Sequence, residues 1–226
     1  MHSRNDMIKH AQLPEAFCWT KFGTESGEAI EDIVARKERE RVANGGVFLW
    51  GIGNSVGPAV REFVRTTATP VVVFSPMRSK PKEIDVTPSS LLTWAGATTL
   101  DGDEWQIPSG SRVVSRDSSK GQRRKTTHYA LVCRSREPLS LGAGMADIAY
   151  ETLANFLSGT RLGHSQVTAV VRRVATDVAS PTVYPAVFIA ELVFPYFVRL
   201  HDPRSTTKPS SRATRRPVQA SLLASA

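Results

Sequence analysis

The stretch from Val47 to Val64 organises the interpretation of the whole chain, and it reads VFLWGIGNSVGPAVREFV. Its first four residues are apolar and predict a short strand. Three glycines among the next seven residues allow the backbone to turn sharply. Asn54 and Ser55 are helix-capping residue types, and Pro58 suits the first turn of a helix, so a helix is predicted up to Val64. A glycine bend that opens a helix presents backbone N–H groups to an anion or to the edge of a base, and we expect a ligand site there.

Elements outside this stretch are predicted from hydrophobic patterns and turn residues. A helix is expected from Glu28 to Asn44, where the charged run Arg36–Arg41 predicts a solvated face with local ion pairs. A second helix is expected over residues 145–157, because apolar residues recur there with a period near 3.6. A helical turn is expected at residues 91–95. Strands are expected at residues 17–22, 71–74, 112–115, 128–133, 166–174, 187–194 and 196–200, the last two separated by a proline that cannot join a ladder.

The order of these elements indicates the fold class. Short strands that do not alternate regularly with helices argue against a doubly wound fold. The prediction is an α+β protein with a small, partly closed β-barrel decorated by two or three helices. Residues 1–11 are expected to be a flexible leader, residues 12–202 a single domain, and residues 203–226 a disordered basic tail.

Composition and charge narrow the classes of partner. The chain of 226 residues carries a net charge of +8, of which +4 falls in residues 202–226. A basic balance favours polyanionic partners such as DNA or RNA. No run of eighteen apolar residues is present and the N-terminus lacks a secretory pattern, so we expect a cytoplasmic protein with no membrane partner. Cys18 and Cys133 are expected to be reduced, buried thiols.

One family resemblance adds to this picture. A tryptophan-bearing strand at Trp19, a helix, and then the string Phe48-Leu49-Trp50-Gly51-Ile52-Gly53-Asn54 in a β-rich body resemble the PUA-like superfamily, in particular its EVE, YTH and ASCH-type members. The likeness covers residues 15–135, and residues 140–200 would be an addition to the family pattern. The resemblance implies a small β-barrel that binds RNA or modified bases in DNA or RNA.

The residues themselves allow the same function. A flipped base is read by stacking on aromatic faces and by hydrogen bonds to its edge. The chain has four tryptophans, although tryptophan more often belongs to the core. We therefore predict a nucleic-acid-binding module, with recognition of a modified or flipped base as its most specific form. Cations at residues 78–82 and 120–125 would hold phosphates. The predicted ligand-binding residues are Trp19, Trp50, Gly51, Gly53, Asn54, Ser55, Ser75, Arg78, Ser115, Arg116 and His128.

Two other functions stay open. Strand Val47–Trp50, the bend, its helix and strand Val71–Phe74 could form a βαβ unit, although the glycine spacing misses the dinucleotide fingerprint by one residue. Ser75 and Arg78 after the second strand would favour a 2′-phosphate, so the alternative is an NADP-type enzyme that uses the Gly51–Gly57 bend as a phosphate cradle. The third possibility is a protein-interaction domain with no small ligand.

The sequence predicts no catalytic residue, no metal site and no cofactor of its own. His128 and Cys133 are an odd number of positions apart on one strand, so their side chains face opposite sides and cannot form a dyad. The histidines and cysteines show no metal-ligand spacing. Whether the protein catalyses a reaction stays open.

Overall fold

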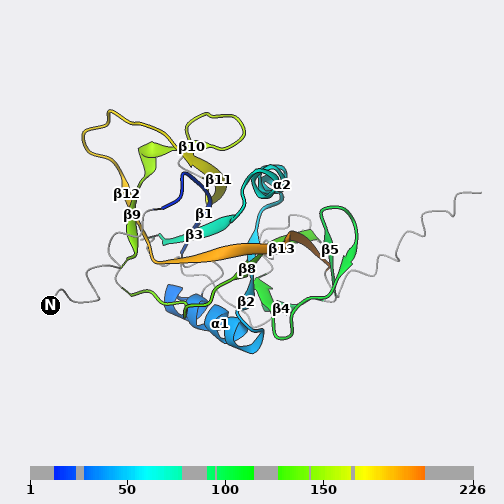
Figure 1. The fold of residues 1–226 in the computed structure, drawn as a ribbon. Helices are drawn as coiled ribbons and strands as arrows, with labels where there is room; N and C mark the ends of the chain where they lie inside the picture. The colour runs from blue at the N-terminus through cyan, green and yellow to red at the C-terminus, as the bar shows by residue number, and fades with distance from the viewer. Residues whose placement is uncertain are drawn as a thin grey trace, which may run out of the picture.

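The computed structural model describes residues 13–23, 28–77, 91–94, 96–114, 127–142, 144–163 and 166–201. The expected leader, the expected tail and the basic cluster at residues 120–125 lie outside these ranges. In the described residues, two α-helices lie at opposite ends of a β-sheet (Figure 1) and contribute to one shared core cluster.

Both α-helices of the described residues lie in the first third of the chain. This part contains β1 (Ala16–Phe22), α1 (Ile30–Ala43), β2 (Val47–Ile52), the 3₁₀ turn η2 (Asn54–Val56), α2 (Gly57–Thr66) and β3 (Val71–Pro76). The rest is β4 (Leu91–Thr93), β5 (Gly96–Thr99), β6 (Glu104–Trp105), β7 (Arg112–Val114), β8 (Thr127–Arg134), β9 (Ala146–Ala149), the 3₁₀ turn η4 (Tyr150–Thr152), β10 (Leu153–Asn155), β11 (Thr168–Arg173), β12 (Val183–Ala186) and β13 (Phe188–His201).

Strand β13 is the centre of a nine-stranded mixed sheet. One edge of β13 pairs with β3 near its start and with β5 near its end, while its other edge pairs with β8. Beyond β3 come β1, β11 and β10; beyond β5 comes β6; and beyond β8 comes β2. Only the β1–β3 pair is parallel among the registered pairs.

The expected barrel is wrong, because the sheet stays open. Its outermost strands β10 and β2 do not pair with each other. The outer edge of β2 is instead capped by helix α1, where the Leu49 N–H donates to Glu40 Oε1 at 2.7 Å. A side chain therefore occupies the hydrogen-bonding edge that a closing strand would need. The α+β class stands, whereas the barrel implied by the PUA-like resemblance does not.

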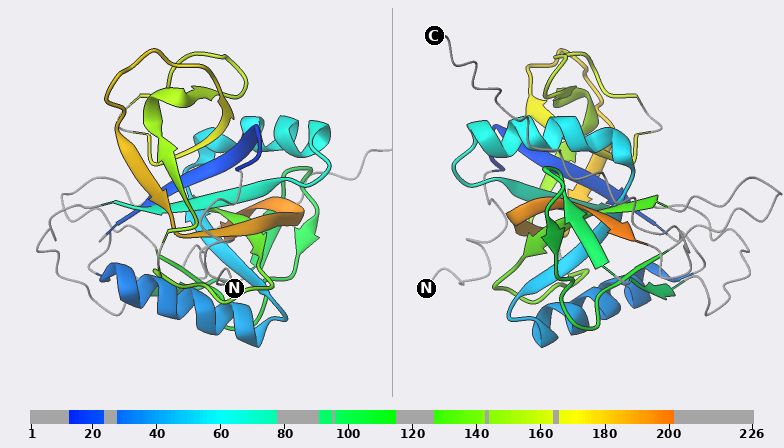
Figure 2. Two further views of the ribbon diagram at one scale, coloured as in Figure 1. Left: turned by 60° about the vertical axis from the view of Figure 1, so that its left-hand side comes forward. Right: turned by 90° about the vertical axis from the view of Figure 1, so that its right-hand side faces the viewer.

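The two faces of the sheet carry separate cores, as strand alternation requires. Phe48 and Trp50 of β2 point to one face, where they join residues of both helices such as Ile33 and Phe63. The other face is covered in two patches: the two-stranded β9–β12 sheet lies over β1 and β3, and the two-stranded β4–β7 sheet lies near β2 (Figure 2). The molecule therefore has three layers: the helices, the nine-stranded sheet and the two small sheets. Its largest core cluster lies between the helices and the nine-stranded sheet.

Helix α1 buries charged residues, contrary to the expected solvated run. Lys37 and Glu40 are 3% and 5% exposed and form an ion pair of 2.8 Å. Lys37 Nζ also donates to the carbonyl of Arg112 at 2.8 Å. Burial lowers the pKa of Lys37, and the Glu40 carboxylate opposes that shift. The pair ties α1 to β2 and β7, while Arg41 pairs with Glu38 at the surface as expected.

Two expected helical segments are strands. Residues 145–157 form β9, η4 and β10, and residues 91–95 contain β4. The apolar residues at 148 and 153 fit a helical period, but they fill the core under the sheet because β9 pairs with β12 and β10 with β11. Tertiary pairing overrides local periodicity here. The two strands expected around Pro195 are one strand with an irregular register, and the Phe194–Pro195 peptide bond is cis.

Among the helices in the described part of the chain, none is long and apolar enough to cross a lipid bilayer.

Candidate functional site

The glycine bend lies at one end of the sheet, beside the start of β8. Ile52, the last residue of β2, pairs with Tyr129, so Gly53 follows next to the position of His128. Gly53, Asn54 and Ser55 are exposed. Neither η2 nor α2 has a side-chain capping hydrogen bond, so the expected capping role of Asn54 and Ser55 is wrong. Their polar side chains are therefore left at the surface of the bend.

Two segments outside the described ranges, residues 115–126 and 202–226, are joined to the described residues near the bend. Thr127, the first residue of β8, pairs with His201, the last residue of β13. Val113 of β7 packs on the bend so closely that a Cβ on Gly51 would lie 2.5 Å from its Cγ1. Residues 115–126 begin one position after Val114, and residues 202–226 begin after His201. We call this region the bend end: Gly51–Ser55, Val113, Val114, Thr127–Tyr129 and Arg199–His201.

His128 belongs to the bend end but faces inward. Its ring lies 4.7 Å from the ring of Trp94, between centroids, and its main chain pairs with Leu200. The structure thus brings His128 close to the bend residues that the sequence singled out. Arg78, Ser115 and Arg116 lie outside the described residues.

Trp50 points away from the surface of the bend. It is 6% exposed and packs against Phe22, Phe74 and Phe188, with ring centroids 5.3, 4.7 and 6.4 Å away. The neighbouring Gly51 belongs to the opposite side of the strand, under Val113. The Trp50 indole is therefore part of the core between the helices and the sheet.

Trp19 and Ser75 form a second group, remote from the bend end. Both are buried, and Trp19 Nε1 donates to Ser75 Oγ at 2.9 Å. Their strands, β1 and β3, pair with each other, and β3 pairs with the beginning of β13, whereas the bend end lies at its last residue. The structure therefore divides the expected site into two groups.

A caged lysine lies beside Trp19. Lys21 Nζ is 5.3 Å from the ring centroid of Trp19, 5.4 Å from that of Tyr150 and 5.2 Å from that of Tyr184. An ammonium over ring faces gains cation–π attraction, more so when it is desolvated. Lys21 is 3% exposed, and this burial lowers its pKa. The cage fastens β1 to η4 and β12. Its rings come from distant parts of the sequence, so no local pattern could have revealed it.

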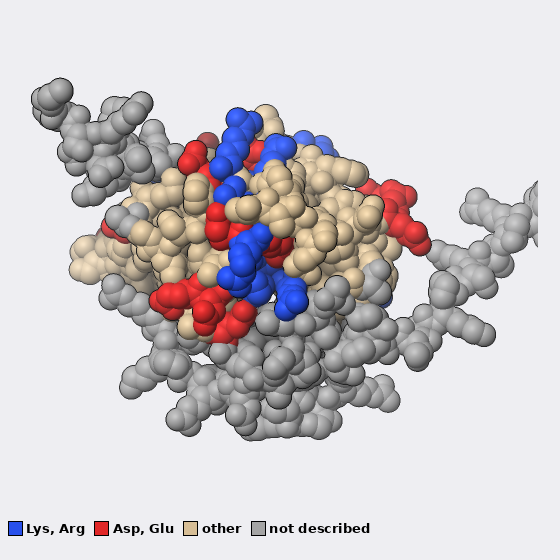
Figure 3. Space-filling model, turned by 90° about the horizontal axis from the view of Figure 1, so that it is seen from below, with Lys and Arg blue, Asp and Glu red and all other residues tan. Residues whose placement is uncertain are grey.

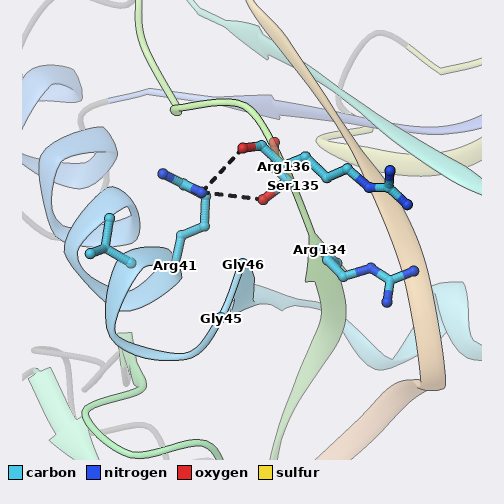
Figure 4. Close-up of a pocket in the computed structure, with 7 residues that line it drawn as sticks. Arg41, Gly45, Gly46, Arg134, Ser135 and Arg136 are labelled. Atoms are coloured by element: carbon cyan, nitrogen blue, oxygen red, sulfur yellow. Dashed lines mark hydrogen bonds between the residues drawn. The ribbon is translucent and has the colours of Figure 1, made fainter.

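A shallow cavity of about 430 Å³ lies at the opposite end of β8, where α1 turns into β2 (Figure 4). Arg41 Nη1 donates to the carbonyls of Ser135 and Arg136 at 3.3 and 3.5 Å, and the rest of its guanidinium binds Glu38. Arg134 pairs with Glu191 of β13 at 2.7 Å. Arg136 is exposed and has no carboxylate partner among the described residues. The cavity is lined by Arg41, Val42, Gly45, Gly46, Arg134, Ser135 and Arg136.

The described fold is not basic. Its residues include 14 Lys and Arg and 15 Asp and Glu, a net charge of −1. The face that carries α1 accordingly shows blue and red side chains interleaved (Figure 3). The whole chain has 29 cations and 21 anions, so the other segments hold 15 and 6, a net +9. Residues 115–126 and residues 202–226 carry +4 each.

The buried thiols do not offer a nucleophile. Cys18 and Cys133 are free and buried, as expected. Burial raises the pKa of Cys18 to about 12 and raises the pKa of Cys133 well above its ordinary value. Both groups therefore stay protonated near neutral pH, and the thiolate is the reactive form. Over the described ranges, no group of three or more His, Cys, Asp or Glu side chains is arranged to hold a metal ion.

Comparison with protein-family models, with curated proteins and with solved structures finds no match to this chain. The PUA-like resemblance therefore depends only on the order of predicted elements and on the string around Trp50.

Proposed function

We propose that the protein binds nucleic acid through the cationic segments that leave the bend end. One observation carries this proposal: the described fold has a net charge of −1, whereas residues 115–126 and 202–226 carry +4 each and join the fold at the paired residues Thr127 and His201. Cations attached at neighbouring points of one end form a local source of positive potential. Such a source favours a polyanion whose phosphates release counterions on binding.

Residues 78–90 strengthen the same end of the molecule. This segment carries +1 and enters β4 at Leu91, which pairs with Val114, the residue before segment 115–126. Residues 78–90, 115–126 and 202–226 together carry a net charge of +9. They join the fold at the pairs Leu91–Val114 and Thr127–His201. At the bend, Asn54 and Ser55 add exposed polar side chains that can bond to phosphate oxygens or base edges.

Recognition of a modified or flipped base stays a prediction within this proposal. Trp19 and Trp50 are 2% and 6% exposed, so neither ring has a face open for stacking in this conformation. Contacts to the phosphate backbone are therefore the better supported mode. A cytoplasmic location, expected from the sequence, fits two free thiols and also stays part of the proposal.

The NADP-type alternative gains no support from the bend. β2 pairs with β8, and β3 with β1 and β13, so β2 and β3 are not adjacent strands of a parallel crevice. Gly51 is packed under Val113, and Gly57 is packed under Phe197, where a Cβ would lie 3.2 Å from the ring. Close packing against side chains accounts for these two glycines.

The test measures binding of labelled single-stranded and duplex oligonucleotides by fluorescence anisotropy across a salt series. Arg123→Gln, Arg124→Gln and Lys125→Gln together remove three cations from segment 115–126. We expect weaker binding, with the single-strand salt slope reduced by about 2, since each phosphate contact contributes roughly 0.7. NADP serves as the small-ligand control.

The matched control removes three exposed cations elsewhere, Arg161, Arg172 and Arg173 on the β10–β11 side. This triple variant should keep the salt slope of the unmodified protein. Absence of binding at roughly 50 mM salt, or an equal loss in both triple variants, would contradict the proposal.

A further inference from the structure

Strand β13 contains a four-residue bulge that exposes an aromatic side chain. Leu192 pairs with Cys133, and the next registered pair is Phe197 with Leu131. Residues 193–196 thus oppose the single residue Val132 of β8. Phe194, within this bulge, is 75% exposed, the largest exposed fraction among the large apolar side chains described. Bulges commonly re-aim side chains at functional places.

The bulge is also strained. Tyr196 has a φ of 65°, the left-handed region that bulky side chains rarely adopt. The structure holds it there: Phe197 is buried and stacks on Tyr129 with centroids 5.4 Å apart, and the Tyr196 ring meets Phe194 edge to face at 6.1 Å. A strained residue at Tyr196 together with an exposed aromatic side chain at Phe194 points to a role for the bulge outside the core.

Two arginines lie at the end of β8, the strand that pairs with β13 on both sides of the bulge. Arg134 is the register partner of Glu191, which precedes Phe194 by three residues, about 10 Å along a strand. Figure 4 shows the side chains of Arg134 and Arg136 extending from the end of β8 toward β13. Glu191 is the one carboxylate that pairs with them among the described residues. Arg136 is therefore available for an anion.

We propose that Phe194 is a stacking platform for an unpaired base of single-stranded nucleic acid, with Arg136 and Arg134 contacting the adjacent phosphates. This inference rests on the proposed function and specifies single-stranded, as opposed to duplex, nucleic acid as the ligand. The occupant is chosen by complementarity: two aromatic rings on β13 and two arginines at the end of the paired strand β8 match one base and its backbone. A base stacks on any exposed aromatic face without a sequence requirement.

The position of the bulge agrees with this occupant. From Phe194, β13 continues to His201, and the +4 segment 202–226 follows in the sequence. A protein partner would be expected to need a wider apolar patch than two rings bordered by charged side chains.

The decisive variant is Phe194→Trp, which keeps the platform and makes it fluorescent. With an oligothymidylate of about 16 nucleotides, stacking should quench its added emission, whereas heparin should bind without that quenching. Because Phe194 is exposed, the variant should fold normally, and circular dichroism with a thermal melt verifies this.

Phe194→Ala provides the affinity measurement. Single-strand affinity should fall roughly 5- to 150-fold, the effect of losing one stacked base, while duplex and heparin affinity stay within about twofold. Leu157→Ala, at an exposed apolar residue far along the chain, should change neither affinity.

The possible failures are distinguishable. If the unmodified protein binds no polyanion, the proposed function fails and this inference fails with it. If it binds single strands with a clear salt slope, but Phe194→Ala has no effect and Phe194→Trp is not quenched, only the inference is overturned. If Phe194→Ala abolishes self-association in size-exclusion chromatography and leaves nucleic-acid affinity unchanged, the bulge is a contact between copies, and the inference is likewise overturned.

Discussion

At the scale of single residues, Gly51 and Gly53 occupy the same bend for different reasons. A Cβ at Gly51 would lie 2.5 Å from Val113 Cγ1, whereas a Cβ at Gly53 would have its nearest neighbour at 4.0 Å. Gly53 also has a φ of −76°, which any residue can adopt. The first glycine is required by packing, and the second is not.

Gly51→Ala should therefore lower the free energy of unfolding by about 1–3 kcal/mol, the usual effect of overpacking. Gly53→Ala should be neutral or stabilise the protein by up to about 1 kcal/mol, because it restricts the unfolded chain. Urea unfolding of both variants measures the difference. Val113→Ala in the Gly51→Ala background should recover part of the loss, and equal effects of the two glycine variants would refute the packing explanation.

The bend shows how far residue patterns predict a site. The glycine string correctly located a strand, a turn and a helix, and the register then brought Gly53 next to His128. The inward orientation of Trp50 could not be predicted, since it depends on which face of β2 the helices cover. Nor could the cage around Lys21, whose rings come from β1, η4 and β12.

At the scale of elements, the contact between α1 and β2 depends on one carboxylate. Glu40 accepts a hydrogen bond from the Leu49 N–H and pairs with the buried Lys37. Without Glu40, the buried Lys37 ammonium would lose its carboxylate partner and the Leu49 N–H would lose its acceptor. Removing one partner of a buried ion pair typically costs 3–5 kcal/mol.

Glu40→Ala should accordingly destabilise the protein by about 3–5 kcal/mol in urea unfolding. Glu40→Gln should cost less, because the amide oxygen can still accept from Leu49. Replacing both members, with Lys37→Met and Glu40→Leu, should recover much of the loss, since no charge is then left buried. A cost below about 1 kcal/mol for Glu40→Ala would show that water reaches the pair.

Element prediction succeeded where local and tertiary preferences agree. Helices α1 and α2 and strands β1, β2, β3 and β8 lie where the patterns placed them. The helix predicted over residues 145–157 is wrong, because Ile148 and Leu153 of that apolar pattern fill one core cluster from strands β9 and β10. Partners such as β12 and β11 decide between these outcomes, and they lie outside any local window.

At the scale of the whole molecule, stability and positive charge are carried by different parts of the chain. The described core clusters end at Leu200, whereas half of the net charge of +8 belongs to residues 202–226. The coarse α+β class was predictable from composition and element order. The open sheet was not, because closure depends on whether a side chain such as Glu40 covers the last edge.

Truncation after His201 should therefore leave the melting temperature within about 1 °C while weakening nucleic-acid binding. The first expectation follows from the position of the core, and the second from the loss of four net positive charges. Differential scanning calorimetry and anisotropy on the same preparation measure both. A fall of several degrees would show that the removed segment packs against the fold.

The position of β13 has a mechanical consequence. Any tension applied to the C-terminal segment enters the fold at His201 and is borne by a strand that is hydrogen-bonded along both edges, to β5 and β3 on one side and to β8 on the other. Such a strand has to slide past several neighbours at once and cannot be peeled from a free border. A ligand pulling on that segment would thus load a strand that neighbouring strands hold on both of its edges.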